Sequence, residues 1–247
     1  ACISTDKNAR VAVETSVKGG EERGLILLAG EVTLNGEHPN YEKIARDTAE
    51  KIGYNSHSIG FDSTSNQRCE VIQKITAQAA TISQGVNNEN QGAGDQGIMF
   101  GYACTETESF PELEGRFFPL AAALSQRLTR RMTNAREDGT LPWARPDAKS
   151  QVTVEYENGK PTKVHTVVIA IQHDKNLKDK FGGSEEKEQQ FVRDEIAKHV
   201  VQDAIPQILL ADGYNLIVNG TGRFADPGGP YADAGLTGRK IIVDTYG

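Results

Sequence analysis

The sequence is poor in cysteine and has no long apolar run, and each shortage excludes a class of protein. Its 247 residues contain three cysteines, Cys2, Cys69 and Cys104, an odd number with no metal-binding spacing. We therefore expect reduced thiols in a cytosolic protein. The longest apolar runs, 24–30 and 117–124, are far shorter than the roughly 18 residues that a membrane helix needs. The N-terminal stretch also lacks the apolar centre of a signal peptide.

Positive charge is in short supply as well. Lys and Arg number 27 and Asp and Glu number 34, which gives a net charge of −7. This acidic balance disfavours nonspecific nucleic-acid binding, although a local cluster of cations can still bind a small anion. Hydrophobic residues make up 37% and charged residues 25%, so the composition is that of a globular protein and excludes collagen-like or disordered chains. The length predicts one or two domains.

Hydrophobic periodicity divides the chain into strands, helices and a polar loop. Strands are expected at 10–17, 24–33, 69–75, 150–156, 163–172, 214–219 and 240–244, and helices at 41–52, 117–136 and 184–198. Asn40 and Gly53 are the expected cap and stop of the first helix, and Asn158-Gly159 predicts a hairpin. The Gly-, Asn- and Gln-rich stretch 84–97 is expected to be a mobile loop. Hairpins and helices alternate without βαβ regularity or a fixed-period repeat, so the expected fold class is α+β.

Apolar spacing also predicts which helix faces are buried. In the first helix, we expect a shared face of Ile44, Ala45, Ala49 and Ile52. In the last helix, the expected inward residues are Phe191, Val192, Ile196 and Val200. Pro206 is expected to bend or end the continuation of that last helix. The chain has no initiator methionine, and it stops at Gly247 just after a strand-like run. We expect it to be a fragment of a longer protein.

Residues 92–97 match the dinucleotide-binding pattern G-x-G-x-x-G, which requires a strand before it and a helix that opens on the last glycine. A polar loop precedes these residues, and 98–105 looks more like a strand than a helix. The context therefore argues against a dinucleotide site. A loop that needs positive φ angles explains the glycines, but it does not explain Asp95 among them.

Residues 221–240 form a second glycine-rich stretch, and it contains Arg223, Arg239 and Lys240. Exposed backbone amides beside cationic side chains suit a polyphosphate ligand. Two tight turns with solvated cations explain the composition equally well. The P-loop pattern G-x-x-x-x-G-K-[ST] is absent from the sequence.

Carboxylates supply the other candidate positions. Glu14 and Glu31 each interrupt an apolar run, where a buried carboxylate would need a cation, a metal or hydrogen-bond donors, but alternation places them on a solvent face just as well. Asp147 and Lys149 follow Trp143 in a segment that a surface salt bridge would also explain. The five histidines have no zinc-binding spacing, and no G-x-S-x-G elbow is present.

Three long segments resemble the S-adenosylmethionine synthetase (methionine adenosyltransferase) family. They are GAGDQGIMFGY at 92–102, DGTLPWARPDAKSQV at 138–152 and the stretch 233–247, and shorter matches lie at 11–15, 53–62 and 83–86. The segment DAKSQV at 147–152 resembles the bacterial members of this family. The resemblance covers nearly the whole chain.

The resemblance implies an enzyme that joins ATP and L-methionine. The methionine sulfur attacks the ribose 5′ carbon, and the departing triphosphate is then cleaved to phosphate and diphosphate. It also implies two Mg²⁺ and one K⁺ per site, a cytoplasmic dimer or tetramer with the active site at the subunit interface, and three related α+β units around a pseudo-threefold axis. The implied divisions are an N-terminal unit at 1–85, a gate-loop segment at 86–90, a central unit at 91–224 and the start of a C-terminal unit at 225–247.

The resemblance assigns roles by position. Lys149, Arg239, Lys240 and Asp95 match positions near the reacting groups. The implied ATP contacts are Asp147, Ala148, Lys149, Arg223, Phe224, Asp233, Arg239 and Lys240. The implied methionine contacts are Glu31, Gln84 and Asp233, and Glu14 matches the potassium-binding glutamate.

The sequence also departs from the family pattern. The family's S-E-G-H-P-D-K segment, with a catalytic histidine and a magnesium aspartate, has no match, nor does its F-S-G-K-D-P-x-K-V-D-R-S segment with the other magnesium aspartate. Between Phe224 and Gly228 the chain carries one residue more than usual. We therefore expect the 247 residues alone to be inactive. A non-catalytic nucleotide-binding module is the alternative, and a dehydrogenase has no support beyond the glycines at 92–97.

Overall fold

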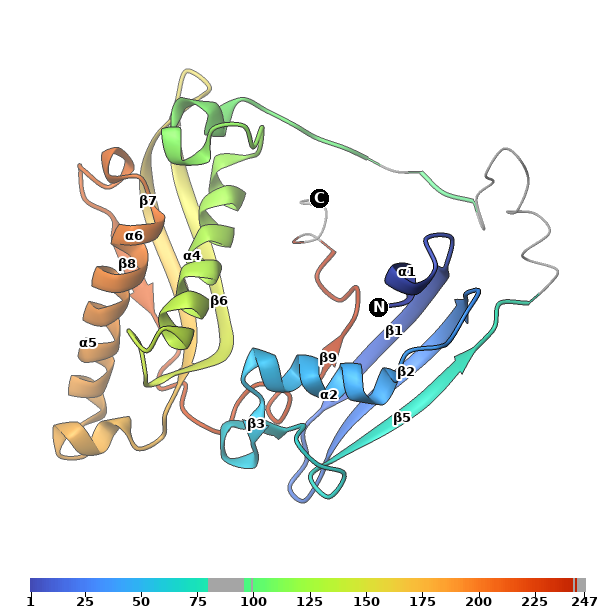
Figure 1. The fold of residues 1–247 in the computed structure, drawn as a ribbon. Helices are drawn as coiled ribbons and strands as arrows, with labels where there is room; N and C mark the ends of the chain where they lie inside the picture. The colour runs from blue at the N-terminus through green and yellow to red at the C-terminus, as the bar shows by residue number, and fades with distance from the viewer. Residues whose placement is uncertain (80–95, 99, 242, 244–247) are drawn as a thin grey trace. The chain divides into compact units, whose positions relative to one another are not determined.

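The computed structural model describes residues 1–79, 96–98, 100–241 and 243, and they form two compact units (Figure 1). One unit comprises Ala1–Gly101 with Pro230–Gly247, and the other comprises Tyr102–Gly229. Each unit combines helices with a sheet, so the fold class α+β is confirmed.

A four-stranded sheet in the order β5-β2-β1-β9 forms the first unit. The strands are β1 (Arg10–Lys18), β2 (Gly24–Thr33), β5 (Cys69–Thr76) and β9 (Gly235–Leu236). β1 and β2 are antiparallel, β5 runs parallel to β2, and β9 pairs with the outer edge of β1. The predicted strand at 24–33 is confirmed with both its ends. The unit also contains α1 (Cys2–Thr5), β3 (Asn55–Ser56), β4 (Phe61–Asp62) and a 3₁₀ turn η1 (His57–Ile59).

The helix α2 (Tyr41–Ile52) begins and ends where its capping residues predict. The Asn40 side chain accepts a hydrogen bond from the Lys43 amide at 2.9 Å, and Gly53 adopts a left-handed φ of 111°. Tyr41, Ala45 and Ala49 pack against the sheet core of Ile26, Leu28, Phe61 and Cys69. The predicted shared face of Ile44, Ala45, Ala49 and Ile52 is confirmed, because all four line one apolar pocket with residues of β1 and β2. Ile44 and Ile52 are 40% and 46% exposed on this face.

A three-stranded sheet in the order β6-β7-β8 forms the second unit. The strands are β6 (Ala144–Glu157), β7 (Lys160–His173) and β8 (Asn215–Val218). Asn158 and Gly159 have φ values of 51° and 75°, so the predicted two-residue hairpin turn is confirmed. The helical elements are α4 (Leu120–Glu137), α5 (Glu185–Ile196), a π-turn η5 (Ala197–Val201), α6 (Gln202–Ala204) and the 3₁₀ turns η2 (Glu106–Ser109), η3 (Pro111–Leu113), η4 (Leu177–Phe181) and η6 (Gln207–Leu209).

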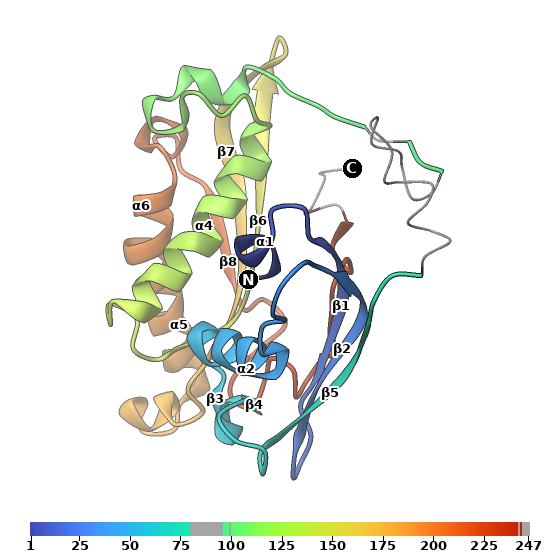
Figure 2. The ribbon, with the colours of Figure 1, turned by 45° about the vertical axis from the view of Figure 1, so that its right-hand side comes forward.

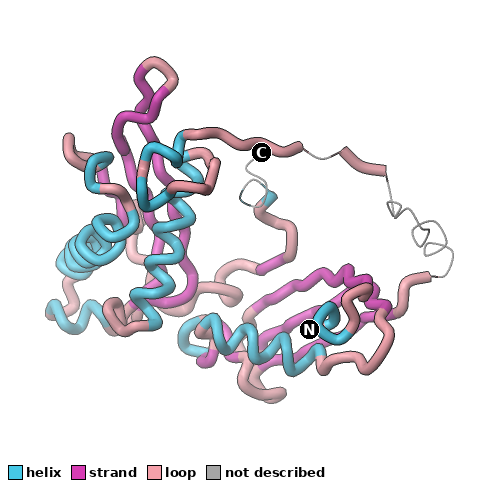
Figure 3. Tube along the Cα trace, turned by 45° about the horizontal axis from the view of Figure 1, so that its top comes forward, coloured by secondary structure: helices cyan, strands magenta, loops and turns pink. Residues whose placement is uncertain are grey.

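The helices of the second unit cover one side of its sheet (Figure 3). Leu124 and Leu128 of α4 belong to the same buried cluster as Ile169 and Ile171 of β7. The inward residues predicted for the last helix are confirmed, since Val192, Ile196 and Val200 are buried and Phe191 packs against the cluster. The helix ends at Ala204, before Pro206.

The two units share one topology, which the sequence does not reveal as a repeat (Figure 2). In each, an antiparallel hairpin is followed by a helix and a strand that runs parallel to the second hairpin strand. The series is β1-β2-α2-β5 in the first unit and β6-β7-α5-β8 in the second.

Two strand predictions are wrong. Among the described residues of 98–105 there is no strand, and residues 241 and 243 are helical rather than extended. Both stretches are rich in apolar residues, but their described residues pair with no neighbouring strand, and pairing is what stabilises an extended segment. No helix in the described part of the chain is both long enough and apolar enough to cross a membrane.

Candidate functional site

In the first unit, the glycine-rich C-terminal stretch lies against strand β1. β9 pairs Leu236 with Ser16, and the Thr237 amide donates to the Thr15 carbonyl at 3.0 Å. The Thr15 amide donates to the Thr237 hydroxyl oxygen at 2.8 Å, and that hydroxyl donates to the Glu14 carboxylate. Residues that are 223 positions apart in the sequence thus share one edge of the sheet.

Arg239 and Asp233 form an exposed ion pair beside this edge. The Arg239 Nη1 lies 3.2 Å from Asp233 Oδ1 and also donates to the Ala234 carbonyl. Their side chains are 45% and 74% exposed, and Lys240 is exposed as well. An exposed pair of this kind contributes little to stability, so both charges remain available to a ligand.

Glu14 and Glu31 occupy one face of the sheet. Glu14 pairs with Ala29 and Glu31 pairs with Ala12, which makes the two glutamates diagonal neighbours on adjacent strands. Both are exposed, so they are not buried carboxylates. The apolar residues that meet α2, such as Val13 and Ile26, alternate with them and lie on the opposite face.

In the second unit, the predicted ATP-contacting segment lies on strand β6. Ala148 packs on the core, and Lys149, next in the strand, is exposed opposite Ala170. Lys149 therefore projects on the face away from α4. Asp147 Oδ2 accepts a hydrogen bond from the Gly229 amide at 3.1 Å, which brings the start of β6 to the second glycine-rich segment.

Arg223 is held by a buried carboxylate. Its Nε donates to Glu188 Oε2 at 2.6 Å and its Nη2 donates to Oε1 at 3.2 Å, while the Glu188 side chain is fully buried. The hydrogen bonds from Arg223 to Glu188 raise the pKa of this guanidinium. The adjoining Phe224 carbonyl accepts from the His173 amide at 3.0 Å. The hydrogen bonds from Arg223 to Glu188 and from the His173 amide thus hold Phe224 beside the end of β7.

A second, partly buried ion-pair network, centred on Arg145, was missed by sequence reasoning. Arg145 Nε lies 3.1 Å from Asp226 and its Nη2 lies 3.0 Å from Asp174, while Gln172 donates to Asp226 at 2.8 Å. Burial tends to raise the pKa of Asp174, but the Asn176 amide and the Arg145 guanidinium hold it below the usual value. Arg145 and Asp226 are 81 positions apart, so no local pattern could have indicated their contact.

The sequence-predicted residues therefore form two groups. Glu14, Glu31, Asp233, Arg239 and Lys240 lie in the first unit, and Asp147, Ala148, Lys149, Arg223 and Phe224 lie in the second. Gln84 and Asp95 lie outside the described residues. In the described part of the chain, no three His, Cys, Asp or Glu side chains converge as a metal site. The Glu14 carboxylate and the Thr237 hydroxyl place two oxygen atoms side by side at the edge of the first sheet.

Comparison with protein families matches nearly the whole chain to one family. The N-terminal domain of S-adenosylmethionine synthetase matches residues 1–80, its central domain matches 90–224 and its C-terminal domain matches 227–247. The central-domain match alone covers more than half of the 247 residues. The three matches occur in the order N-terminal, central, C-terminal. The chain therefore belongs to the S-adenosylmethionine synthetase family.

Proposed function

We propose that this chain supplies ATP and methionine contacts for methionine adenosyltransferase. In this reaction the sulfur of L-methionine attacks the ribose 5′ carbon of ATP and expels the triphosphate, which water then cleaves to phosphate and diphosphate. The three family-domain matches support the general function. The observation that carries the proposal is that β1, β2 and β6 present Glu14, Glu31 and Lys149 on the faces turned away from the helices.

Positive side chains carry the chemical part of the proposal. The leaving triphosphate bears about four negative charges, so a site for it needs preorganised cations and amide donors. Arg239 and Lys240 are exposed beside the Gly-rich edge of the first unit, and Lys149 is exposed on β6. We assign these three side chains to the phosphates, and Phe224 to the adenine ring through its aromatic face. Asp95 is proposed to lie near the substrates.

The remaining contacts follow the family pattern. Glu31, Gln84 and Asp233 are proposed to bind methionine, and Asp147, Ala148 and Arg223 to line the ATP site. Because Arg223 is already bonded to Glu188, we propose that it positions Phe224 rather than gripping phosphate. Family enzymes use Mg²⁺ to neutralise the polyphosphate and K⁺ beside the potassium-binding glutamate, here Glu14.

We further propose self-association through the open sheet face of the first unit, in a dimer or tetramer. Besides Glu14 and Glu31, that face presents the half-buried apolar side chains of Leu25 and Leu27 and the methyl group of Ala29. A second copy would cover these groups and bring two sets of site residues together. A cytoplasmic location fits the three free cysteines.

The shared β-β-α-β topology of the two units supports the family's pseudo-threefold arrangement, with residues 225–247 as the opening of a third unit. We also propose divisions at 1–85, 86–90 and 91–224. We propose that the 247 residues alone form little product, because they contain no counterpart of the family's catalytic histidine or magnesium aspartates.

ATP binding by this chain tests the assignment. The double variant R239Q/K240Q should weaken ATP binding, measured by calorimetry, at least tenfold. The matched variant K7Q/K51Q removes two exposed charges from the same unit and should bind as the unchanged chain does. Equal weakening in both variants would mean that net charge, not the site, determines binding.

Turnover provides the second test, in a complete enzyme that contains these residues. Lys149→Ala and Arg239→Ala should each lower kcat about 100-fold, the loss typical of one donor to developing charge. Methionine KM should change much less. If only the methionine KM rose, these positions would not serve the departing phosphates.

A further inference from the structure

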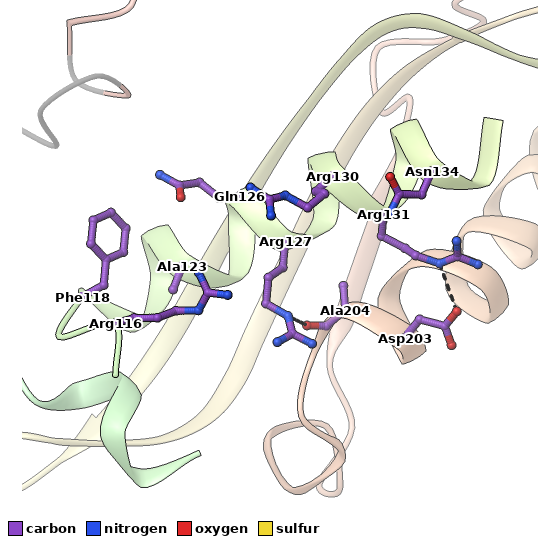
Figure 4. A pocket seen from close by; sticks show the side chains of 10 residues that line it. All are labelled: Arg116, Phe118, Ala123, Gln126, Arg127, Arg130, Arg131, Asn134, Asp203 and Ala204. Carbon is purple, nitrogen blue, oxygen red and sulfur yellow. Dashed lines mark hydrogen bonds and ion pairs between the residues drawn. The ribbon is translucent and has the colours of Figure 1, made fainter. Parts of the chain in front are cut away.

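A cavity of about 510 Å³ lies beside α4 in the second unit, and none of the site residues assigned above lines it (Figure 4). Its wall contains Arg116 from the segment before α4 and Arg127, Arg130 and Arg131 from α4 itself. One carboxylate, Asp203, faces them. Four positive groups and one negative group give this wall a net charge of +3, although the whole chain has a net charge of −7.

The arginines differ in how their charge is compensated. Arg131 lies 3.0 Å from Asp203 and 3.4 Å from Asp138, so carboxylates neutralise it. Arg127 instead donates from Nε to the Ala204 carbonyl at 2.8 Å and from Nη1 to the Glu112 carbonyl at 2.9 Å. Backbone carbonyls fix the direction of this half-buried guanidinium but leave its full positive charge in place.

Arg116 and Arg130 are free to take a ligand. Among the described residues, neither side chain has a hydrogen-bond or ion-pair partner. Figure 4 shows Arg116 reaching across Ala123 toward Arg127, and Arg130 beside the next turn of α4. Arg127 and Arg130 are three residues apart on α4, so their like charges repel each other, and a bound anion would relieve that repulsion.

We propose that this cavity is a binding site for a small phosphate-bearing anion of the diphosphate class. The planar guanidinium fork matches phosphate oxygens in pairs, and three arginines without carboxylate partners line this cavity. The volume is within the range of small-molecule sites. Phe118 adds an aromatic wall, and Gln126 and Asn134 add neutral donors. The site shares no residue with the proposed ATP and methionine contacts, so it is a second, separate anion site.

Calorimetric titration of the 247-residue chain with inorganic diphosphate tests the proposal. The variant R116Q/R130Q should weaken binding at the cavity at least tenfold. Both side chains are exposed and unpartnered, so the fold should be unaffected, as circular dichroism can verify. The matched variant K187Q/R193Q removes two exposed charges from α5 in the same unit and should bind like the unchanged chain. Asp203→Asn removes the competing carboxylate and should strengthen binding several-fold.

Diphosphate can also bind at the proposed substrate site, so the titration is repeated in the R239Q/K240Q variant. Binding that persists there and is lost in R116Q/R130Q places the anion in the cavity. The proposal is wrong if the unchanged chain binds no diphosphate, if R239Q/K240Q abolishes all binding, or if K187Q/R193Q weakens it as much as R116Q/R130Q. None of these outcomes depends on whether the chain transfers adenosyl groups.

Discussion

At the scale of single residues, Glu188 connects the core of the second unit to the Arg223–Phe224 segment. Its carboxylate is fully buried, bonds both Nε and Nη2 of Arg223, and lies 3.6 Å from His173 Nε2. A carboxylate in the first turn of a helix is ordinary, and nothing local distinguishes Glu188 from Glu185 or Glu186. Only its burial shows that it has a structural role.

Glu188→Gln should lower the free energy of unfolding by about 3 kcal/mol, because it leaves the partly buried Arg223 without its counter-charge. Urea unfolding followed by Trp143 fluorescence measures the change. Glu186→Gln removes an exposed charge from the same helical turn and should change stability by no more than about 0.5 kcal/mol. Similar losses in the two variants would show that the helix dipole, not the buried pair, accounts for the effect.

His173 gives the second unit a pH dependence. Burial lowers its pKa, an effect that the Glu188 carboxylate opposes and Arg223 reinforces. Because the folded-state pKa is below the unfolded value of about 6.5, the unfolded chain binds more protons between the two. The contribution of neutral His173 to the free energy of unfolding is fully present above about pH 6.5. It should fall as the pH drops below that value, by at most about 1.4 kcal/mol per pH unit.

Unfolding free energies measured between pH 8 and pH 5 test this dependence. His173→Gln should flatten the slope below pH 6.5, whereas His165→Gln, at an exposed position, should leave it unchanged. If the free energy of unfolding of His173→Gln falls below pH 6.5 as steeply as that of the unchanged chain, the titration of another group causes the pH dependence.

At the scale of elements, local chemistry sets where α2 begins and ends. The Asn40 side chain satisfies the Lys43 amide, an orphan donor of the first turn. Asn40→Ala should therefore destabilise the first unit by about 1 kcal/mol, and Asn40→Ser should restore most of the loss. Denaturant unfolding followed by far-ultraviolet circular dichroism measures both. Equal stability of Asn40→Ala and the unchanged chain would show that packing alone holds the helix end.

At the scale of the whole molecule, the two units have cores of very different size. In the described residues, the core cluster of the first unit comprises Ile26, Leu28, Phe61 and Cys69, while that of the second comprises more than twenty buried side chains. Buried apolar area is the main stabilising term, so the first unit should unfold at a lower denaturant concentration. Trp143, the one tryptophan of the sequence, lies in the core of the second unit and reports on that unit.

Circular dichroism should therefore begin to change before Trp143 fluorescence does. Ile26→Ala should shift only the early part of the transition, and Leu124→Ala should shift the fluorescence midpoint. Each substitution should lower the free energy of unfolding of its own unit by about 3 kcal/mol. Coincident transitions in all three chains would show that the units unfold cooperatively.

The sequence by itself determined the features that depend on neighbouring residues. The hairpin at Asn158-Gly159, the caps of α2 and the apolar faces of the strands all follow from local conformational preference and periodicity, and the structure confirms them. The family, too, could be identified from the sequence, because its motifs are long continuous stretches.

Tertiary structure decided the features that depend on contacts between distant residues. It placed Thr237 beside Glu14, Glu188 beside Arg223 and Arg145 beside Asp226. It also decided how far each residue of the apolar face of α2 is covered, and Ile44 on that face is 40% exposed. It also showed one β-β-α-β topology in two units without a repeat in the sequence. The physical reason is that burial and charge compensation depend on which surfaces meet after folding, and residue spacing along one helix or strand does not specify its partner.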